Sequence, residues 1–421
     1  MNNQQVECGC DEIPQSLLST DEALDILLDS VKVTSKTSYL ELDDALNGIL
    51  AIDLYSSINV PDFDNSAMDG YAINLETDKV NIPGGLTFDI TDRIAAGSIG
   101  NNLSPGCAAR IFTGAPIPKG ANTVIMQEEC SLTDNDSKIE IYRPISLKEN
   151  IRPKGNDIEI GDLILRSGIK LMPQDIALAA SVGINKLEVR GRLKVGVFFT
   201  GDELVEPGIE VKPGQIYNSN RYALVALLNN LGCEIINLGN IEDSLDSTCK
   251  ALETLMHKCD IIMTTGGVSV GEEDHVKPAV ELLGELSLWR IKMKPGKPLA
   301  FGKVGNAAFI GLPGNPVSAI VTFLLFARPF IKKMQGYSDI LNNTIKVESN
   351  FDWNISKSRR EFIRVRIDNS TIPPKVEKYP KQGSDVLSSI VWADGLAEIP
   401  ERSTFSSGEI LDFYPFIEMT S

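Results

Sequence analysis

The chain has 421 residues, and its 57 acidic and 40 basic residues give a formal net charge of −17. A balance this acidic argues against non-specific binding to nucleic acid or to an anionic membrane surface. No apolar run reaches the roughly 20 residues of a membrane span, because the nearest candidate, residues 319–330, contains Arg328 and Pro329. The amino-terminal MNNQQVECGCDEIP lacks the basic and apolar regions of a signal peptide. We therefore expect a cytoplasmic protein.

Cysteine and histidine usage narrows the chemistry. Seven widely spread cysteines are an odd number, typical of reduced thiols rather than of a disulfide framework. Cys8 and Cys10 form a C-x-C pair, which is weak evidence for a metal site in a polar tail. The only two histidines are His257 and His275. A histidine-rich metal site and a Ser-His-Asp triad are therefore both disfavoured.

The amino-terminal part of the chain predicts helices followed by short strands. Residues 1–14 are expected to form a disordered tail, and residues 15–190 a helical and β-rich region of two subdomains that serves as linker and in dimerisation. Ser19 and Glu22 have capping-box spacing and open a helix, and a second helix is predicted from Tyr39. From about residue 55, short β-rich runs alternate with Gly, Pro and Asn turns, with one helix beginning at Pro173.

The rest of the chain predicts two further domains. Residues 191–335 alternate buried strands with helices, as in RLKVGVFFT followed by YALVALLNN, which indicates a doubly wound, mostly parallel sheet. Residues 336–421 return to short strands and indicate a small β-barrel. The predicted fold class is thus multidomain α/β plus β. Ligands of doubly wound sheets bind at the carboxyl ends of the strands, which here are TGDE, TTGGVSVGEED and GLPGNP.

The stretch TTGGVSVGEED at 264–274 places acid beside a glycine-rich turn. Gly266 and Gly267 allow close backbone approach to a ligand, and Ser269 follows them. Such turns receive anions, which Asp274 would repel unless a cation lay between. By itself Asp274 is better explained as a helix cap. The combination of glycines, hydroxyls and acids favours a phosphate site with a divalent ion such as Mg²⁺.

Two further strand ends carry acids. TGDEL at 200–204 contains Glu203, which is suited to a cation or a substrate hydroxyl, although a solvated acidic turn is an equally good explanation. Asp243 follows the next strand. Glu203, Asp243 and Asp274 are therefore the candidate metal ligands.

Basic residues gather at one turn. MKPGKP at 293–298 holds Lys294 and Lys297, and Arg290 lies just upstream. Cations on a rigid turn suit an oxyanion or a phosphate, and basic clusters are scarce in so acidic a chain. GLPGNP, with Pro313 and Pro316, is a stiff turn that delivers a helix N-terminus, which also favours an anion.

Two loops of the β-rich region are rich in polar residues. PDFDNSAMDGYAI at 61–73 includes Asp69, and NIRPKGND at 150–157 includes Arg152 and Asp157. Asx-rich turns explain both loops on physical grounds alone, with a functional role as the alternative.

Taken together, these stretches resemble one family. PDFDNSAMDGYAI, IFTGAPIP, NIRPKGND, FFTGDEL, GQIYNSNR, TTGGVSVGEED, KMKPGKPLAFG and GLPGNPVSA occur in the order found in molybdopterin molybdenumtransferase, that is, MoeA and the gephyrin E region. The resemblance covers about residues 15–415. It implies a homodimer of four-domain subunits with the active site near the subunit interface. It also points to contacts with the adenylyltransferase of the pathway and with recipient apo-molybdoenzymes.

The resemblance also implies residue roles. Asp69, Thr113, Asp243, Asp274 and Lys294 match positions with catalytic roles. The substrate-binding set consists of Arg152, Asp157, Glu203, Gly266, Gly267, Ser269, Arg290, Lys297, Pro313, Pro316, Arg364 and Ser384. One departure is Arg290, which stands where the family commonly has lysine, so that a forked guanidinium replaces a point charge.

The implied reaction inserts molybdate into the dithiolene of adenylylated molybdopterin, with Mg²⁺ as cofactor, and releases AMP and molybdenum cofactor. Both substrates are anions, so the site must supply positive charge and exclude water. One alternative is an ATP-consuming adenylyltransferase of the Mog type, which needs only the central domain. The other is a non-catalytic cofactor carrier or scaffold.

Overall fold

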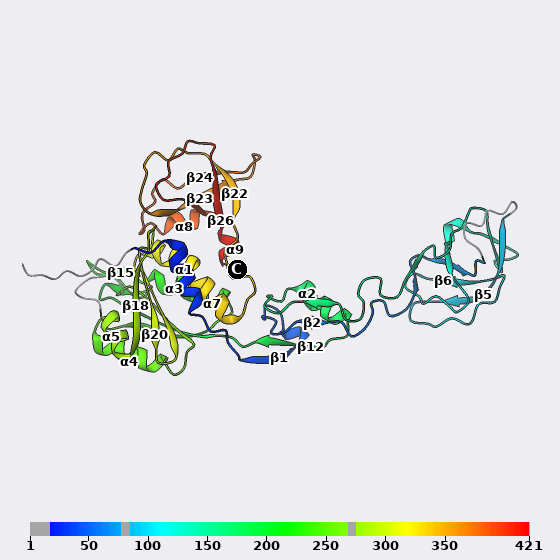
Figure 1. Ribbon diagram of the computed structural model, residues 1–421, viewed down its shortest axis with the longest axis horizontal. Helices are drawn as coiled ribbons and strands as arrows, with labels where there is room; N and C mark the ends of the chain where they lie inside the picture. Colours follow the sequence, from blue (N-terminus) through cyan, green and yellow to red (C-terminus); the bar gives the residue numbers. More distant parts are fainter. Residues whose placement is uncertain (1–16, 77–84, 268–274, 421) are drawn as a thin grey trace, which may run out of the picture. The chain divides into compact units, whose positions relative to one another are not determined.

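The computed structural model describes residues 17–76, 85–267 and 275–420 (Figure 1). By its internal contacts the chain divides into two units. One unit contains Met1–Ser38, Gly168–Lys170 and Val189–Ser421, and the other contains Tyr39–Ser167 and Leu171–Glu188. We call them the α/β–barrel unit and the β-rich unit. Among the described residues, no helix is both long and apolar enough to cross a membrane.

The β-rich unit is built on a six-stranded sheet of order β7-β4-β6-β5-β9-β8. Its pairings are antiparallel except for β5 with β6, which is parallel. Strands β4, β6 and β7 are mostly buried, and the core on one face of the sheet includes Tyr71, Ile73 and Ile139. The strands are β4 (Gly70–Ile73), β5 (Leu86–Ile94), β6 (Cys107–Ile111), β7 (Thr123–Met126), β8 (Ser131–Thr133) and β9 (Lys138–Ile141).

Other short strands between residues 37 and 190 form three two-stranded pairs. They pair β1 with β12, β2 with β11 and β3 with β10. Their bounds are β1 (Thr37–Glu41), β2 (Leu54–Tyr55), β3 (Asn65–Ser66), β10 (Ile151–Arg152), β11 (Leu163–Leu165) and β12 (Lys186–Arg190). The helical segments are η1 (Leu42–Asp44), η2 (Gln127–Glu129) and α2 (Pro173–Ser181), the last of which the sequence predicted.

The helix predicted from Tyr39 is wrong. The backbone there forms strand β1 against β12, and the N–H of Leu42 donates to the carbonyl of Asn185. Asn47 then takes a left-handed conformation with φ 64°, which ends any helical run because consecutive right-handed residues are required. Pairing with a strand almost 150 residues away overrides the local helical pattern.

The central sheet of the α/β–barrel unit has the order β16-β13-β17-β21-β20-β18. The first four strands are parallel and the last two antiparallel, which confirms a mostly parallel sheet. The strands are β13 (Lys194–Thr200), β16 (Glu234–Ile241), β17 (Ile261–Thr265), β18 (Gly284–Arg290), β20 (Pro298–Val304) and β21 (Ala307–Leu312). A small parallel pair, β14 (Leu204–Val205) and β15 (Ile216–Tyr217), follows β13.

Helices cover both faces of this sheet, as a doubly wound fold requires. Strand β13 shows why: Val197 and Phe199 pack into the cluster with α3 and α6, whereas Phe198 packs into the cluster with α4 and α5. Burial on both faces explains the unbroken apolar run of the strand. The helices are α3 (Ser219–Asn230), α4 (Leu245–Leu255), α5 (Val276–Leu283), α6 (Pro316–Thr322) and α7 (Arg328–Gln335), with a π-helical turn η3 (Phe323–Ala327) joining the last two.

The carboxyl-terminal strands close into a five-stranded barrel. The ring runs β23-β24-β22-β26-β25 and closes by pairing β25 with β23. Strand β19 (Met293–Lys294), from the lysine turn, pairs in parallel with β23 and places Lys294 beside Glu361. The other elements are β22 (Ile345–Ser349), β23 (Arg360–Asp368), β24 (Lys375–Lys378), α8 (Ser388–Trp392), β25 (Gly395–Ile399), β26 (Ile410–Pro415) and α9 (Phe416–Thr420).

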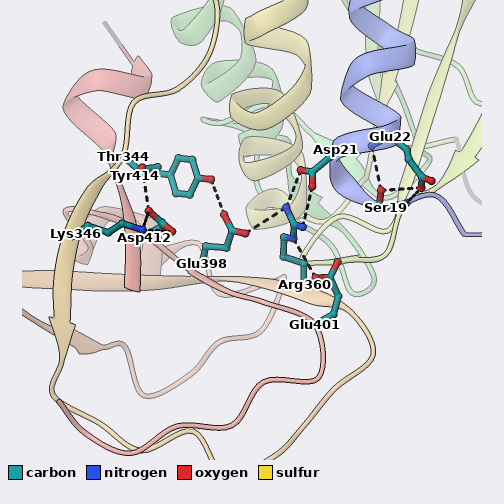
Figure 2. Close-up of polar contacts among 10 residues, drawn as sticks. All are labelled: Ser19, Asp21, Glu22, Thr344, Lys346, Arg360, Glu398, Glu401, Asp412 and Tyr414. Atoms are coloured by element: carbon teal, nitrogen blue, oxygen red, sulfur yellow. Dashed lines mark hydrogen bonds and ion pairs between the residues drawn. The ribbon is translucent and has the colours of Figure 1, made fainter. Parts of the chain in front are cut away.

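Helix α1 (Thr20–Asp29) begins with the predicted capping box, in which Glu22 N–H donates to Ser19 Oγ at 3.2 Å and Ser19 N–H to Glu22 Oε2 at 2.8 Å. By its contacts this helix is part of the α/β–barrel unit. Figure 2 shows the polar part of that contact: Arg360 of the barrel donates to both carboxylate oxygens of Asp21, at 2.9 and 3.1 Å.

Candidate functional site

A cavity of about 960 Å³ lies in the α/β–barrel unit, where β13, β17 and β21 end. Ligands of doubly wound folds bind at this edge, and the volume is at the upper end of the range for small-molecule sites. Eight predicted site residues line it: Glu203, Gly266, Gly267, Lys294, Lys297, Pro313, Pro316 and Ser384. Segments separated by almost 200 residues in the sequence thus meet at one site.

The glycine turn forms one wall of the cavity. Gly266 and Gly267 follow β17 with φ values of 85° and 62°, a left-handed conformation that strains residues with a side chain. The N–H of Gly266 donates to the carbonyl of Leu312 at 3.0 Å, which ties this turn to the end of β21. Two predicted residues of the stretch, Ser269 and Asp274, lie outside the described residues.

Two helix N-termini also face the cavity. Asn218 caps α3 by accepting from the N–H of Arg221 at 3.0 Å, and Ser219 and Asn220 line the cavity. Asn315 and Pro316 begin α6, and Asn220 Nδ2 donates to the carbonyl of Gly314 at 2.6 Å. Helix N-termini carry partial positive charge and bind anions. Sequence reasoning used GQIYNSNR only for the resemblance and assigned no role to these asparagines, although an N-cap at a strand–helix connection was the available signal.

The lysine turn supplies two positive charges, of which one is paired with a carboxylate and the other has no ion-pair partner among the described residues. Lys294 Nζ lies 3.2 Å from Glu361 Oε1, and Lys357 Nζ lies 3.0 Å from Glu361 Oε2. Glu361 is only 2% exposed, so this carboxylate holds Lys294 in place and offsets part of its charge. Lys297 makes no ion pair with any described residue. Arg290, at the end of β18, is exposed and does not line the cavity.

Carboxylates stand at two neighbouring strand ends. Glu203 lines the cavity. Asp243 accepts a hydrogen bond of 2.6 Å from the hydroxyl of Thr200, which also lines it. Within the described ranges, no group of three His, Cys, Asp or Glu side chains could hold a metal. The oxygen donors nevertheless suit Mg²⁺, because this ion usually binds through one or two protein carboxylates plus substrate phosphates and water.

The barrel contributes the remaining wall. Ser384, Asp385 and Arg359 line the cavity, and the carbonyl of Ser384 accepts from Val317 N–H of α6 at 3.0 Å. Sequence reasoning missed Arg359 and Asp385, because nothing in a short strand pattern shows which way a barrel loop faces.

Arg364, predicted to bind substrate, is only 1% exposed and does not line the cavity. Its guanidinium donates to Ser389 Oγ at 2.9 Å and to the carbonyl of Gly383 at 2.8 Å. Burial lowers the pKa of Arg364 to about 10. Arg364 therefore supports the loop that carries Ser384 from behind.

The other predicted residues belong to the β-rich unit. Asp69 Oδ1 accepts from the backbone N–H and from the hydroxyl of Thr113, both at 2.8 Å, so the structure brings these two residues together. The hydrogen bond from the backbone N–H of Thr113 is the main cause of the lowered pKa of Asp69. Arg152 is exposed on β10, and Asp157 lies in the loop that follows.

Models of three domain families match the chain in order. They are the MoeA N-terminal region (domain I and II) over residues 18–183, a probable molybdopterin binding domain over residues 196–333 and the MoeA C-terminal region (domain IV) over residues 346–416. The cavity is lined mainly by the second of these matched regions, with its remaining wall from the third. The fold and the cavity thus define a multidomain protein of the MoeA type.

Relatives of known name cover nearly the whole chain. A molybdopterin molybdenumtransferase of Haemophilus influenzae is 39% identical over 95% of this chain and 99% of its own. One from Nostoc sp. is 33% identical over 89% of this chain and 87% of its own. A crystal structure of a molybdopterin biosynthesis MoeA protein from Pyrococcus horikoshii has a TM-score of 0.81 at 31% identity, covering 95% of this chain and 100% of that one. The chain belongs to the molybdopterin molybdenumtransferase (MoeA) family, enzymes of molybdenum cofactor biosynthesis.

Proposed function

We propose that this enzyme inserts molybdate into the dithiolene of adenylylated molybdopterin and cleaves the phosphoanhydride, releasing AMP. The observation that carries the proposal is the cavity at the carboxyl edge of the sheet. In a chain of net charge −17, that cavity collects Lys294, Lys297 and Arg359 together with two helix N-termini and the Gly266–Gly267 turn. Such a site suits two anionic substrates at once.

The chain's own groups would act by positioning and by charge. Lys297 and the backbone N–H groups at the start of α3 and α6 would bind phosphate or molybdate oxygens, and Lys294 would add a fixed positive charge. Glu203 and Asp243 would hold Mg²⁺, with Asp274 as a third ligand. When bound, Mg²⁺ would neutralise charge on the phosphoanhydride oxygens.

The chemistry balances without a redox partner. The two thiols of the dithiolene and molybdate form two Mo–S bonds, and one molybdate oxygen leaves as water with both thiol protons. Cleavage of the phosphoanhydride breaks one P–O bond. A water activated beside the bound molybdate forms one new P–O bond as the bridging P–O bond breaks, so that the pterin phosphate and AMP both leave as phosphate monoesters. No covalent protein nucleophile is required.

Several parts of the proposal extend beyond the cavity. We propose that Asp69 and Thr113 take part in the reaction, with Arg152 and Asp157 contributing to binding. We also propose that the active enzyme is a cytoplasmic homodimer that contacts the adenylyltransferase and recipient apo-molybdoenzymes. Sedimentation of the pure protein at several concentrations tests the dimer, and a monomer of 45.9 kDa at all of them would contradict it.

The decisive experiment is an anaerobic incubation of pure protein with adenylylated molybdopterin, Mg²⁺ and molybdate, following AMP by chromatography. We expect molybdate-dependent AMP release without ATP. AMP transfer from ATP to free molybdopterin would instead establish an adenylyltransferase, and tight pterin binding without turnover would establish a carrier.

One variant and its control test the metal role of Asp274 in the same assay. Asp274→Ala is expected to abolish AMP release while the protein stays folded by circular dichroism. Asp29→Ala, an acid at the end of α1 outside the cavity, is the matched control. Full activity of the Asp274 variant would remove the metal role of that residue.

A further inference from the structure

The Asp69–Thr113 pair lies where three neighbouring strands of the β-rich unit meet. Asp69 directly precedes β4, whose first residue, Gly70, pairs with Ile111 at the end of β6 and with Met126 at the end of β7. The Asp69 side chain is exposed, and both hydrogen bonds from Thr113 go to its Oδ1. A carboxylate in this position needs support from surrounding residues to keep one orientation toward a substrate.

Arg110, which is half-buried on β6, supports the backbone on both sides of this carboxylate. Its Nη1 donates to the carbonyl of Gly70 at 3.1 Å, and its Nη2 donates to Oε1 of Gln127. The backbone N–H of Gln127 in turn donates to the carbonyl of Asp69 at 3.1 Å. One guanidinium therefore fixes two successive carbonyls, one directly and the other through Gln127.

Two aromatic rings hold the Arg110 guanidinium. Its Cζ lies 5.1 Å from the centroid of the Tyr71 ring and 4.8 Å from that of the Phe112 ring. Tyr71 is only 6% exposed and belongs to the core of the sheet, so it gives the guanidinium a fixed surface to pack against. Phe112 directly precedes Thr113. Arg110 thus contacts both segments that carry the Asp69–Thr113 pair.

Arg93 provides a comparison within the same sheet. It pairs with Arg110 across β5 and β6, and its Cζ lies 4.7 Å from the centroid of the same Phe112 ring. Arg93 is exposed, and its guanidinium donates no hydrogen bond within the part of the chain that the structure describes. The two arginines share their charge and their aromatic neighbour, but of the two it is Arg110 that bonds to the loop of Asp69.

We propose that Arg110 is a positioning residue for the reaction, whose forked hydrogen bonds fix the backbone at Asp69 so that its carboxylate keeps one orientation. A planar guanidinium reaches the Gly70 carbonyl and Gln127 at the same time, whereas the ammonium of a lysine is a single point charge. This inference rests on the proposed role of Asp69 in the reaction and adds the residue through which the fold holds Asp69 in place.

Steady-state kinetics of AMP release by the full-length protein test the inference. The variants are Arg110→Gln, Arg110→Lys and, as matched control, Arg93→Gln, and far-ultraviolet circular dichroism shows whether each is folded. We expect Arg110→Gln to lower kcat about tenfold with KM for molybdate nearly unchanged, because substrate still binds but a reacting group is misplaced. Arg110→Lys should recover only part of that loss, and Arg93→Gln should react like the wild type. Full recovery by Arg110→Lys, or equal kcat for Arg110→Gln and Arg93→Gln, would overturn the inference.

A double-mutant cycle distinguishes positioning of Asp69 from a general structural role. Because Arg110 acts through Asp69, Arg110→Gln should cost little further kcat in a protein that already carries Asp69→Asn. Single-turnover measurements can follow the low activity of these proteins. A loss as large as in the wild-type background would show that Arg110 acts independently of Asp69, and the inference would fail.

Hydrogen exchange separates the inference from the proposed function, because it needs no substrate. The backbone N–H groups of Thr113 and Gln127 both donate to Asp69 and should exchange faster in Arg110→Gln than in Arg93→Gln. Equal exchange in the two variants would contradict the inference. A wild type that releases no AMP, together with faster exchange in Arg110→Gln, would refute the proposed reaction and leave Arg110 as the residue that fixes the Asp69 loop.

Discussion

Two regions of the α/β–barrel unit differ in whether their cations have carboxylate partners. In the cavity, Lys297 and Arg359 have no ion-pair partner among the described residues. Between α1 and the barrel, one residue further along the strand, Arg360 is surrounded by three carboxylates, and Tyr414 donates to one of them, Glu398, at 2.7 Å (Figure 2). The difference separates cations that hold the fold together from cations that are kept available for a ligand.

The contrast also has an energetic basis. A paired cation lowers the energy of the folded chain but has little attraction left for a substrate, whereas an unpaired cation stabilises the fold little and binds an anion strongly. Substitutions in the two regions should therefore separate function from stability.

The largest effect is expected at the lysine turn. Lys297→Gln should lower kcat/KM for AMP release about 100-fold, because a charged hydrogen-bond donor to the transition state is lost. Its melting temperature should stay within a degree or two of the wild type. Steady-state kinetics and a thermal melt check both points, with Lys303→Gln, at the exposed position of β20, as control. A lower melting temperature with an unchanged kcat/KM would show that Lys297 stabilises the fold rather than binding the substrate.

Glu361 belongs both to the residues that stabilise the fold and to those that shape the cavity, because this buried carboxylate holds Lys294, a cation of the cavity. Glu361→Gln should lower the free energy of unfolding by about 2 kcal/mol, less than for a fully buried pair because both lysines reach solvent. Those lysines, Lys294 and Lys357, have side chains that are 38% and 37% exposed. Urea titration measures the loss. The control is Lys357→Gln, which leaves the pair with Lys294 intact, and a greater loss from that control would contradict the central role of Glu361.

Arg360→Gln should show the reverse of Lys297→Gln. Removing the Arg360 guanidinium leaves Glu398 and Glu401 close together without a cation between them, and should lower the free energy of unfolding by about 1 kcal/mol. The loss should shrink in high salt, since Asp21 is 71% exposed and its attraction is screened. Anion binding by equilibrium dialysis should not change. A weakened affinity for AMP or molybdate in this variant would erase the distinction between Arg359 and Arg360.

The smallest effect is expected to have the opposite sign. Lys332 is 8% exposed, and burial is the main cause that lowers its pKa from 10.5 to about 8. The folded chain binds the Lys332 proton less tightly than the unfolded chain. Burying the charged ammonium therefore lowers the free energy of unfolding by its full amount below about pH 8, and this loss disappears as the pH rises toward 10.5. Lys332→Met should therefore raise the free energy of unfolding at pH 7 by about 1 kcal/mol, after allowance for the lost contact with the Tyr337 ring.

Melting curves of this variant and the wild type at pH 7 and pH 10 test that prediction. The difference between them should shrink at pH 10. Other charges around Lys332 influence the size of the effect, namely those of Arg328, Asp339, Lys170 and Glu418. A difference that grows with pH would show that the pKa of Lys332 is not lowered in the folded chain.

Much of the fold was predictable because its signals are local. The apolar run of β13, the capping box at Ser19 and the glycine turn after β17 each depend on neighbouring residues. The predicted helix from Tyr39 failed for the complementary reason, since β1 forms only through pairing with distant β12. The π-helical turn inside the helix that closes the central domain was likewise not predicted, because nothing in FLLFA distinguishes it from an α-helix.

The site shows the same division. Glycines, prolines and lysines of the strand ends were found because strand ends of a parallel sheet meet at one edge. The same reasoning from strand ends could not predict the contacts of Glu361, Arg359 and Arg364. These three residues lie within six positions of one another, yet one lines the cavity, one binds its lysine and one supports a loop from behind.

Local sequence patterns are enough to predict which segments of the central domain become strands and helices and which strand ends carry the chemistry, because periodicity and turn residues act over a few positions. It also carried the ordered motifs that indicate the family. Which cations have no ion-pair partner among the described residues follows from the fold, because pairing depends on the groups that the fold brings within about 4 Å of each ammonium or guanidinium group. Arg359 and Arg360 are adjacent in the chain, and their different surroundings follow from strand alternation and from the packing of α1 against the barrel.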